Sequence, residues 1–247
     1  MMRFYYSSLY LFASLLSAFA ANAQTSDFTP EHEFTKNCEG PSVDAEGNVY
    51  AVNYAIDGTI AEIPRRNKAS IFLTLPKGST GNGIRFGSAN TFYVADFTGH
   101  NVLKVDLKTK QVSVYCNEPG MNQPNDLAIT RTGHIFCSDP NWKEGTGQLW
   151  HVSPAGKAKI IAPNMGTTNG IEVSPDEKTL YVNESVQLNV WAFDLAADGT
   201  ISNKRLLIKF SDGGMDGMRC DNNGNLYITR HGKGEVAVVS PQGKVIK

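Results

Sequence analysis

The sequence predicts an all-β fold, a β-propeller in which about five four-stranded blades are visible. A short pattern occurs five times: a polar residue, an apolar strand, a turn and a second apolar strand. Successive copies are spaced by 43, 43, 44 and 47 residues. A repeat of about 40–50 residues made of short strands is typical of propeller blades. Helical periodicity is absent outside the N-terminal segment.

Each copy begins at a polar residue, which we call its anchor. The anchors are Glu39, Asn82, Asn125, Asn169 and Asp216. After each anchor we expect an inner strand, a turn rich in Gly, Asn or Asp, and a second strand running back. Third strands are predicted at 102–106, 148–152, 190–194 and 235–239, and fourth strands at 71–75, 112–115, 159–162 and 206–210.

The sequence stops after the third strand of its fifth repeat. It therefore predicts either a five-bladed ring or a six-bladed ring that is cut short. We assign residues 24–247 to this propeller domain and expect it to be incomplete at its C-terminal end. Residues 25–37 are polar apart from Phe28 and Phe34, and we expect them to supply a strand to a neighbouring blade.

The N-terminal 23 residues have the pattern of a signal peptide. Arg3 precedes a mostly apolar stretch at 9–20, and Ala21-Asn22-Ala23 fits the small-x-small cleavage rule. The alternative, a membrane anchor, is disfavoured because this apolar stretch is short for a bilayer. We expect cleavage before Gln24, a periplasmic or secreted protein, and no membrane insertion afterwards.

Net charge and cysteine positions exclude several classes of protein. The formal net charge is −1 and the charges are scattered, so nothing favours nucleic acid as a partner. We expect a monomer. None of the four cysteines has metal-ligand spacing. Cys38 and Cys220 would come close if the anchors converge, but strand direction can point them apart, so a disulfide between them is the less favoured alternative.

The anchors predict a metal site on the propeller axis. Inner strands of a propeller line the central tunnel, so residues at equivalent points of the blades form a ring. All five anchors offer oxygen, which suits a hard divalent cation, with Ca²⁺ first and Mg²⁺, Mn²⁺ or Zn²⁺ as alternatives. Asn-Gly and Asp-Gly pairs also begin strands without any ligand. Five anchors in phase, with acids at the first and last, favour the metal.

Four motifs resemble those of the SMP-30/gluconolactonase/LRE family: Glu39-Gly40-Pro41, Pro124-Asn125-Asp126, Asn169-Gly170-Ile171 with Ser174-Pro175-Asp176, and Asp216-Gly217-Met218. The resemblance implies a six-bladed propeller of metal-dependent hydrolases that include gluconolactonases. It also implies that the catalytic metal ligands are Glu39, Asn125, Asn169 and Asp216. Asn82 does not match a family position, and ring geometry alone makes it a candidate substrate contact.

The predicted activity is metal-assisted hydrolysis of a lactone. The cation would polarise the ester carbonyl and lower the pKa of a bound water. Asp216 is the first candidate for general base, ahead of Glu39 and then Asp126. The alternative is a non-catalytic propeller that binds a sugar or a peptide with a structural metal.

The other sequence patterns do not indicate a further functional site. Four residues that follow the second strands, Asp139, Trp142, Glu184 and His231, are expected to be ordinary loop residues. The five histidines are scattered, and each is expected to be a surface or packing residue. There is no G-x-S-x-G or H-E-x-x-H motif.

Overall fold

The structure, a computed structural model, describes residues 27–64, 68–88 and 90–247. These residues form β-strands and turns without a helix, so none of them belongs to a helix long and apolar enough to cross a membrane. The predicted signal peptide, residues 1–23, lies outside the described residues.

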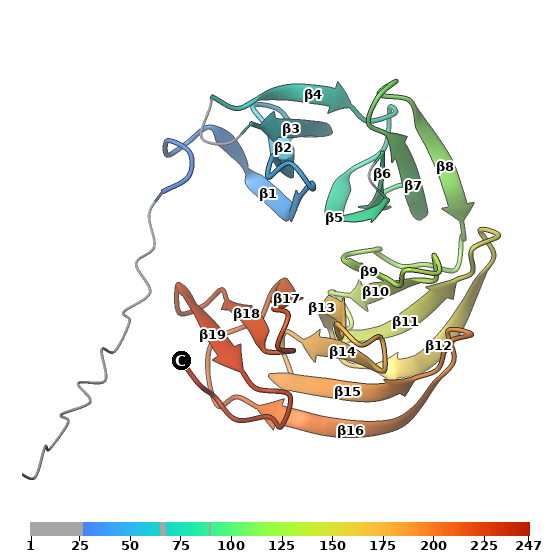
Figure 1. Cartoon of the computed structure of the whole chain (residues 1–247), viewed down its shortest axis with the longest axis vertical. Coiled ribbons are helices and arrows are strands. Elements are labelled where there is room, and N and C mark those ends of the chain that lie inside the picture. The colour runs from blue at the N-terminus through green and yellow to red at the C-terminus, as the bar shows by residue number, and fades with distance from the viewer. Residues whose placement is uncertain (1–26, 65–67, 89) are drawn as a thin grey trace, which may run out of the picture.

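Five antiparallel sheets surround a central axis, and the first strand of each sheet is the innermost (Figure 1). The first sheet contains β1 (Phe34–Val43), β2 (Val49–Tyr54), β3 (Thr59–Ile63) and β4 (Ser70–Thr74). The second contains β5 (Gly81–Ser88), β6 (Thr91–Asp96), β7 (Asn101–Asp106) and β8 (Val112–Asn117). The third contains β9 (Leu127–Ile129), β10 (Ile135–Asn141), β11 (Thr146–Val152) and β12 (Ala158–Met165).

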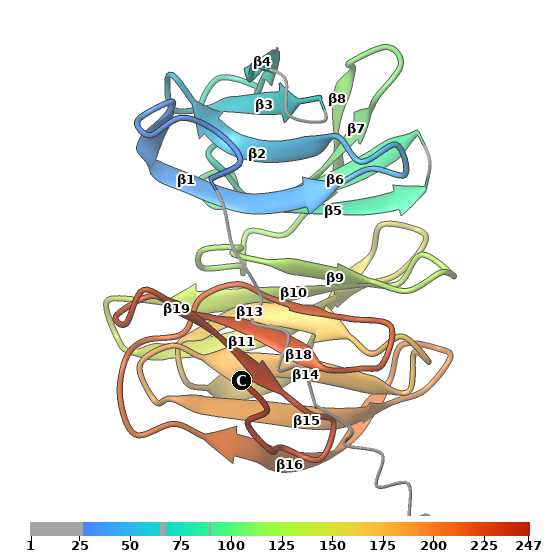
Figure 2. The ribbon, with the colours of Figure 1, turned by 60° about the vertical axis from the view of Figure 1, so that its left-hand side comes forward.

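The remaining two sheets complete this arrangement. The fourth contains β13 (Thr168–Val173), β14 (Thr179–Glu184), β15 (Asn189–Leu195) and β16 (Ile201–Lys209). The fifth has three strands, β17 (Met218–Cys220), β18 (Leu226–Arg230) and β19 (Glu235–Val239). β9 lies between β5 and β13 in both views, and the ring is open between the fifth sheet and the first (Figures 1 and 2).

The all-β propeller prediction is confirmed, with two corrections. The prediction missed the third strand of the first sheet, β3, although Asp57-Gly58 before it and Pro64 after it are turn signals. Phe34 was expected in a neighbouring blade, but it belongs to β1 and pairs with Tyr54 of the same sheet. Their rings pack edge to face at 5.3 Å, which favours this pairing.

The turns between first and second strands follow one local rule in the first, third, fourth and fifth sheets. A side chain that accepts hydrogen bonds opens the turn, and a residue with positive φ closes it. Asp221 accepts from the amide of Asn225 at 2.9 Å, and Gly224 has a φ of 82°. Asp44 does the same for Asn48 at 2.8 Å, with Gly47 at 87°. These turns return the chain directly, which keeps successive strands in one sheet.

Four hydrophobic cores fill the four interfaces between neighbouring sheets. In the first, Tyr50 contacts the rings of Phe72, Phe86 and Phe92 with centroids 5.2, 5.5 and 5.7 Å away. In the last, Leu226 and Ile228 of β18 are fully buried against the fourth sheet. Side chains alternate along a strand, so Tyr227 between them lies on the opposite face and is 43% exposed.

Two histidines pack together where β10 begins and β11 ends, with His151 buried and His134 half-buried. The Nδ1 atom of His134 lies 2.7 Å from Nε2 of His151, and the two rings stack. Burial, together with the neighbouring His134 and Lys159, lowers the pKa of His151 from 6.5 to about 4, with Asp198 opposing. The prediction that this histidine is a packing residue agrees with its 4% exposure.

This pair predicts acid sensitivity. In the unfolded chain His151 takes up its proton near pH 6.5, and in the folded chain only near pH 4. The free energy of unfolding should therefore fall as pH falls from about 6.5 to about 4. His151→Gln should flatten that part of the profile in urea titrations, whereas His32→Gln, at an exposed position, should not. Equal slopes in His151→Gln and wild type would contradict the assignment.

Candidate functional site

All five anchors line one cavity at the axis, with a volume of about 300 Å³. The carboxylate anchors come from the first and fifth sheets, and the amide anchors from the three sheets between them. The remaining wall includes Cys38, Pro41, Met218, Arg219 and Tyr227. The sequence prediction that these five residues meet therefore agrees with the structure, and their chemical roles remain predictions.

Irregular strand pairing aims the anchors at the axis. The register of β1 shifts between Glu39 and Ser42. The same shift occurs in β13 around Asn169 and in β5 around Asn82. An extra residue in one strand of an antiparallel pair re-aims a side chain, and such bulges concentrate next to functional sites. Asn125 and Asp216 lie just before their strands.

A glycine follows four of the five anchors. A Cβ atom on Gly83 would lie 2.5 Å from Oδ1 of Asp126, and one on Gly170 would lie 2.6 Å from the carbonyl oxygen of Asp216. The backbones of neighbouring sheets touch at these points. The amide of Gly83 donates to the Asn125 carbonyl at 2.7 Å. These glycines therefore set how closely successive anchors approach one another.

A pair of glycine variants tests this account. Gly170→Ala should force the fourth and fifth sheets apart and lower the free energy of unfolding by about 1–3 kcal/mol. Gly217→Ala is the matched control, because its Cβ would meet nothing nearer than Thr229 Oγ1 at 3.9 Å. It should have no comparable effect in urea titrations. Equal destabilisation by the two variants would contradict the role given to Gly170.

The side-chain oxygen atoms of the anchors other than Glu39 are not consumed by hydrogen bonds from the described residues, whereas the Glu39 carboxylate accepts the backbone amide of Gly40. The amide nitrogen of Asn169 donates to Ser185 Oγ at 3.0 Å, and Ser185 in turn donates to the Met215 carbonyl. This chain of bonds leaves Asn169 Oδ1 as the atom free to face the cavity. Within the described residues, the side chains of Asn82, Asn125 and Asp216 make no hydrogen bond.

Negative charge is concentrated in this cavity. Burial, and then the charges of Asp216 and Asp126, raise the pKa of Glu39 to about 7. Carboxylates that are buried beside each other resist ionisation because each charge destabilises the next. A bound cation would relieve this repulsion, so the electrostatics of the cavity favour a positively charged ligand.

The residues present fit a divalent cation. The two carboxylates and the amide oxygens of Asn125 and Asn169 line one cavity, and Ca²⁺ prefers such oxygen ligands. The cationic donor in the wall, Arg219, pairs with Asp126. Across the described ranges there is no cluster of three or more His, Cys, Asp or Glu with metal geometry. A site here would therefore depend on the asparagine oxygens of Asn125 and Asn169, which place neutral ligands between two acids.

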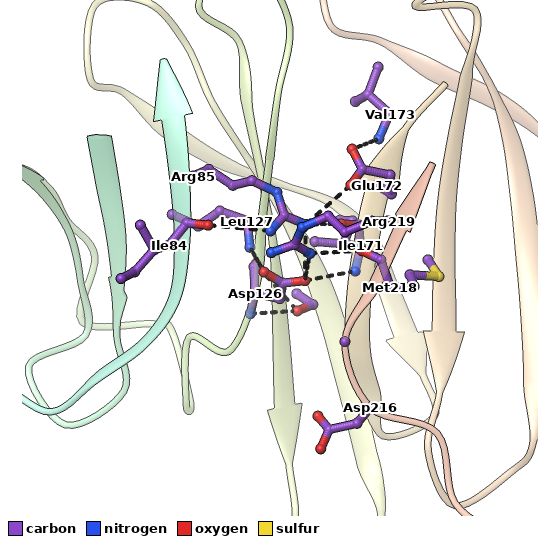
Figure 3. Close-up of polar contacts among 12 residues, drawn as sticks. Ile84, Arg85, Asp126, Leu127, Ile171, Glu172, Val173, Asp216, Met218 and Arg219 are labelled. Atoms are coloured by element: carbon purple, nitrogen blue, oxygen red, sulfur yellow. Dashed lines mark hydrogen bonds and ion pairs between the residues drawn. The ribbon is translucent and has the colours of Figure 1, made fainter. Parts of the chain in front are cut away.

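A second ring of polar residues, missed by the sequence analysis, lies three positions after the anchors. It contains Arg85, Glu172 and Arg219, and Asp126 completes a charge cluster with them in which Arg219 is partly exposed (Figure 3). Asp126 lies 3.2 Å from Arg85 and 3.4 Å from Arg219. The repeat alignment could have located these residues, because Arg85, Glu172 and Arg219 each lie three positions after an anchor.

Asp126 therefore holds arginines together. Burial raises its pKa, and Arg85 opposes that rise. It receives the amide of Leu127 at 2.9 Å and of Ile171 at 3.4 Å, while Asp216 lies apart from the cluster (Figure 3). Arg219 also donates to the Pro41 carbonyl at 3.1 Å and so joins the fifth sheet to the first. As a general base, Asp126 is a poorer candidate than Asp216.

Breaking the cluster should be costly. Asp126→Ala leaves Arg85 paired only with Glu172, 3.4 Å away, and should lower the free energy of unfolding by about 3–5 kcal/mol. The control is Asp194→Ala, which breaks the exposed Arg205–Asp194 pair and should change stability little. Denaturant titration measures both, and a tolerated Asp126→Ala would show that the cluster contributes no stability.

Other predicted residues fall outside the cavity. Asp139 and Glu184, expected as ordinary loop residues, are buried, with 0% and 3% exposure. Trp142 is 40% exposed, and His231 lines a neighbouring surface pocket. All four cysteines are free, so Cys38 and Cys220 are not bridged. Asp139 and Glu184 were missed because local sequence does not indicate burial at the end of a strand.

A propeller with an oxygen-lined cavity on its axis defines the class of protein. Residues 37–247 match the model of the SMP-30/Gluconolactonase/LRE-like region, and the chain belongs to this family. The resemblance stated from the motifs is confirmed.

Individual relatives agree with this assignment. The chain is 31% identical over 189 residues to the gluconolactonase of Zymomonas mobilis, which covers 67% of this chain. It spans about half, 52%, of that protein's length. It is 33% identical over 221 residues to Lactonase drp35 of Staphylococcus saprophyticus, covering 84% of this chain and 68% of that protein. The calcium-binding protein regucalcin of Agrobacterium tumefaciens has the same fold, with a TM-score of 0.75 and 23% identity over 90% of this chain and 75% of that one.

Proposed function

We propose that this chain hydrolyses lactones in the axial cavity, with a divalent cation held by Glu39, Asn125, Asn169 and Asp216. The convergence of these oxygen donors in one cavity, where the side-chain oxygens of Asn125, Asn169 and Asp216 have no partner among the described residues, is the observation that carries the proposal. Relatives named gluconolactonase and lactonase support the substrate class. When bound, the cation would polarise the ester carbonyl and acidify a water.

Residues of the chain would act as general base and as substrate contact. Asp216 lies at the cavity wall without a hydrogen bond to the described residues, so its carboxylate is free to accept a proton from water. Glu39, whose pKa is raised to about 7, is the second candidate. Asn82, half-buried in the same wall, is proposed to donate to or accept from the substrate.

The identity of the cation is part of the proposal. Ca²⁺ comes first because the donor set is oxygen only, and a structural neighbour is described as calcium-binding. Mg²⁺, Mn²⁺ and Zn²⁺ are the alternatives. Export, a monomeric state and a small-molecule lactone as the substrate belong to the same proposal, and export rests on the signal peptide predicted in residues 1–23.

Hydrolysis of an aldonolactone and acyl-lactone panel, with and without chelator, tests the proposal. Chelation should abolish turnover, and Ca²⁺ should restore it. Asp216→Ala should lower kcat/KM by about 100-fold or more, because it removes both a ligand and the candidate base. Asp221→Ala is the matched control, since this acid lies in the turn at the other end of β17.

Activity that survives both the chelator and Asp216→Ala would refute the proposed function. Cation binding without turnover of any lactone would instead favour the non-catalytic alternative, in which the propeller binds a sugar or a peptide and the metal is structural.

A further inference from the structure

Three sheets carry a buried carboxylate at the end of their second strand. These residues are Asp96 of β6, Asp139 of β10 and Glu184 of β14, with exposures of 0%, 0% and 3%. Buried carboxylates are costly unless they are fully hydrogen-bonded. These carboxylates therefore need hydrogen-bond donors, and the positions of the donors show which segments of the chain each carboxylate holds in place.

Each acid accepts backbone amides from the loop that leads into its own anchor. Asp139 accepts from Asn122 at 2.8 Å and Gln123 at 2.6 Å, three and two residues before Asn125. Glu184 accepts from Gly166 at 2.8 Å, three residues before Asn169. The third acid does the same, because Asp96 accepts from Thr80 at 3.0 Å, two residues before Asn82.

Each acid also accepts a side-chain donor from the third strand of its sheet. Asp139 accepts Trp150 Nε1 and Gln148 Nε2, both at 2.8 Å. Glu184 accepts Asn189 Nδ2 at 2.8 Å, and Asp96 accepts Asn101 Nδ2 at 2.8 Å. One carboxylate thus joins a rigid strand pair to the anchor loop, through hydrogen bonds to a charged acceptor, which are stronger than neutral ones.

In the fifth sheet the charges are exchanged: the end of the second strand carries an arginine, and the anchor loop carries the acid. Arg230 occupies the end of β18, is 2% exposed, and donates to Asp212 Oδ1 at 3.0 Å and to the Asp212 carbonyl. Asp212 lies four residues before Asp216. The connection between second strand and anchor loop is kept, although the charges are exchanged.

We propose that Asp139 and Glu184 are positioning residues for the cation site, which fix the loops so that the side-chain oxygens of Asn125 and Asn169 face the cavity. This inference rests on the proposed function, because it needs those asparagines as ligands. The residue next to Glu184 is Ser185, which holds the Asn169 amide nitrogen at 3.0 Å. Around Asp139 every partner is a donor, so no neutral side chain of similar size satisfies them all.

The decisive comparison is between equivalent acids. Asp139→Ala and Glu184→Ala release loops that carry proposed ligands. Asp96→Ala is the matched control: it is equally buried and bonded, but its loop carries Asn82, which lies outside the proposed ligand set. Ca²⁺ dissociation constants are measured by calorimetry on the cation-free full chain, with the melting temperature of each variant.

Both test variants should weaken Ca²⁺ binding by about tenfold or more, as is usual for residues that orient metal ligands. Asp96→Ala should lower the melting temperature comparably while leaving the dissociation constant unchanged. Unchanged binding in the test variants, or equal weakening in Asp96→Ala, would overturn the inference. If Asp139→Ala does not fold, Glu184→Ala against the same control decides.

Asp216→Ala separates this inference from the proposed function. If wild type binds none of Ca²⁺, Mg²⁺, Mn²⁺ and Zn²⁺, the proposed cation site is wrong, and the inference is overturned with it. If wild type binds and Asp216→Ala does not, while Asp139→Ala and Glu184→Ala bind normally, the cation site stands and only the positioning role is wrong.

Discussion

Contact between the backbones of neighbouring inner strands is the constraint on which the rest of the site depends. Five residues, each more than forty positions from the next, line one cavity because the backbones of neighbouring sheets meet at the glycines that follow three of them, Gly40, Gly83 and Gly170. A Cβ at Gly170 would overlap the Asp216 carbonyl, and one at Gly83 would overlap Asp126. The four hydrophobic cores hold the sheets around the axis, and the glycines decide how near the axis their inner strands come.

The third sheet departs from this pattern and thereby organises the charges. Where the other sheets have glycine, it has Asp126, whose carboxylate lies between Arg85 and Arg219. The two arginines and two acids balance one another next to the cavity, so they leave the charges of Glu39 and Asp216 uncompensated. A cation is then the natural counter-charge for the anchors, while the cluster beside them binds four of the five sheets together.

Much of this arrangement was predictable from the sequence. The repeat spacing located all five anchors, and the turn residues located most strands. β3 was missed although Asp57-Gly58 marks the turn before it. The same repeat alignment could also have predicted Arg85, Glu172 and Arg219, because each lies three positions after an anchor. The burial of Asp139 and Glu184 could not be predicted from the sequence. It depends on Trp150 and Asn189, which belong to the third strands of their sheets, and the pairing register of those strands is set only when the sheet forms.

The sequence by itself determined the propeller class, the residues that meet on the axis and their oxygen chemistry, because a periodic chain repeats the same position in every sheet. Tertiary structure decided which oxygens remain free and which acids serve as internal supports. It also decided that Asp126 pairs with arginines while Asp216 faces the cavity. These choices depend on contacts between different sheets, and no periodicity within a single strand records them.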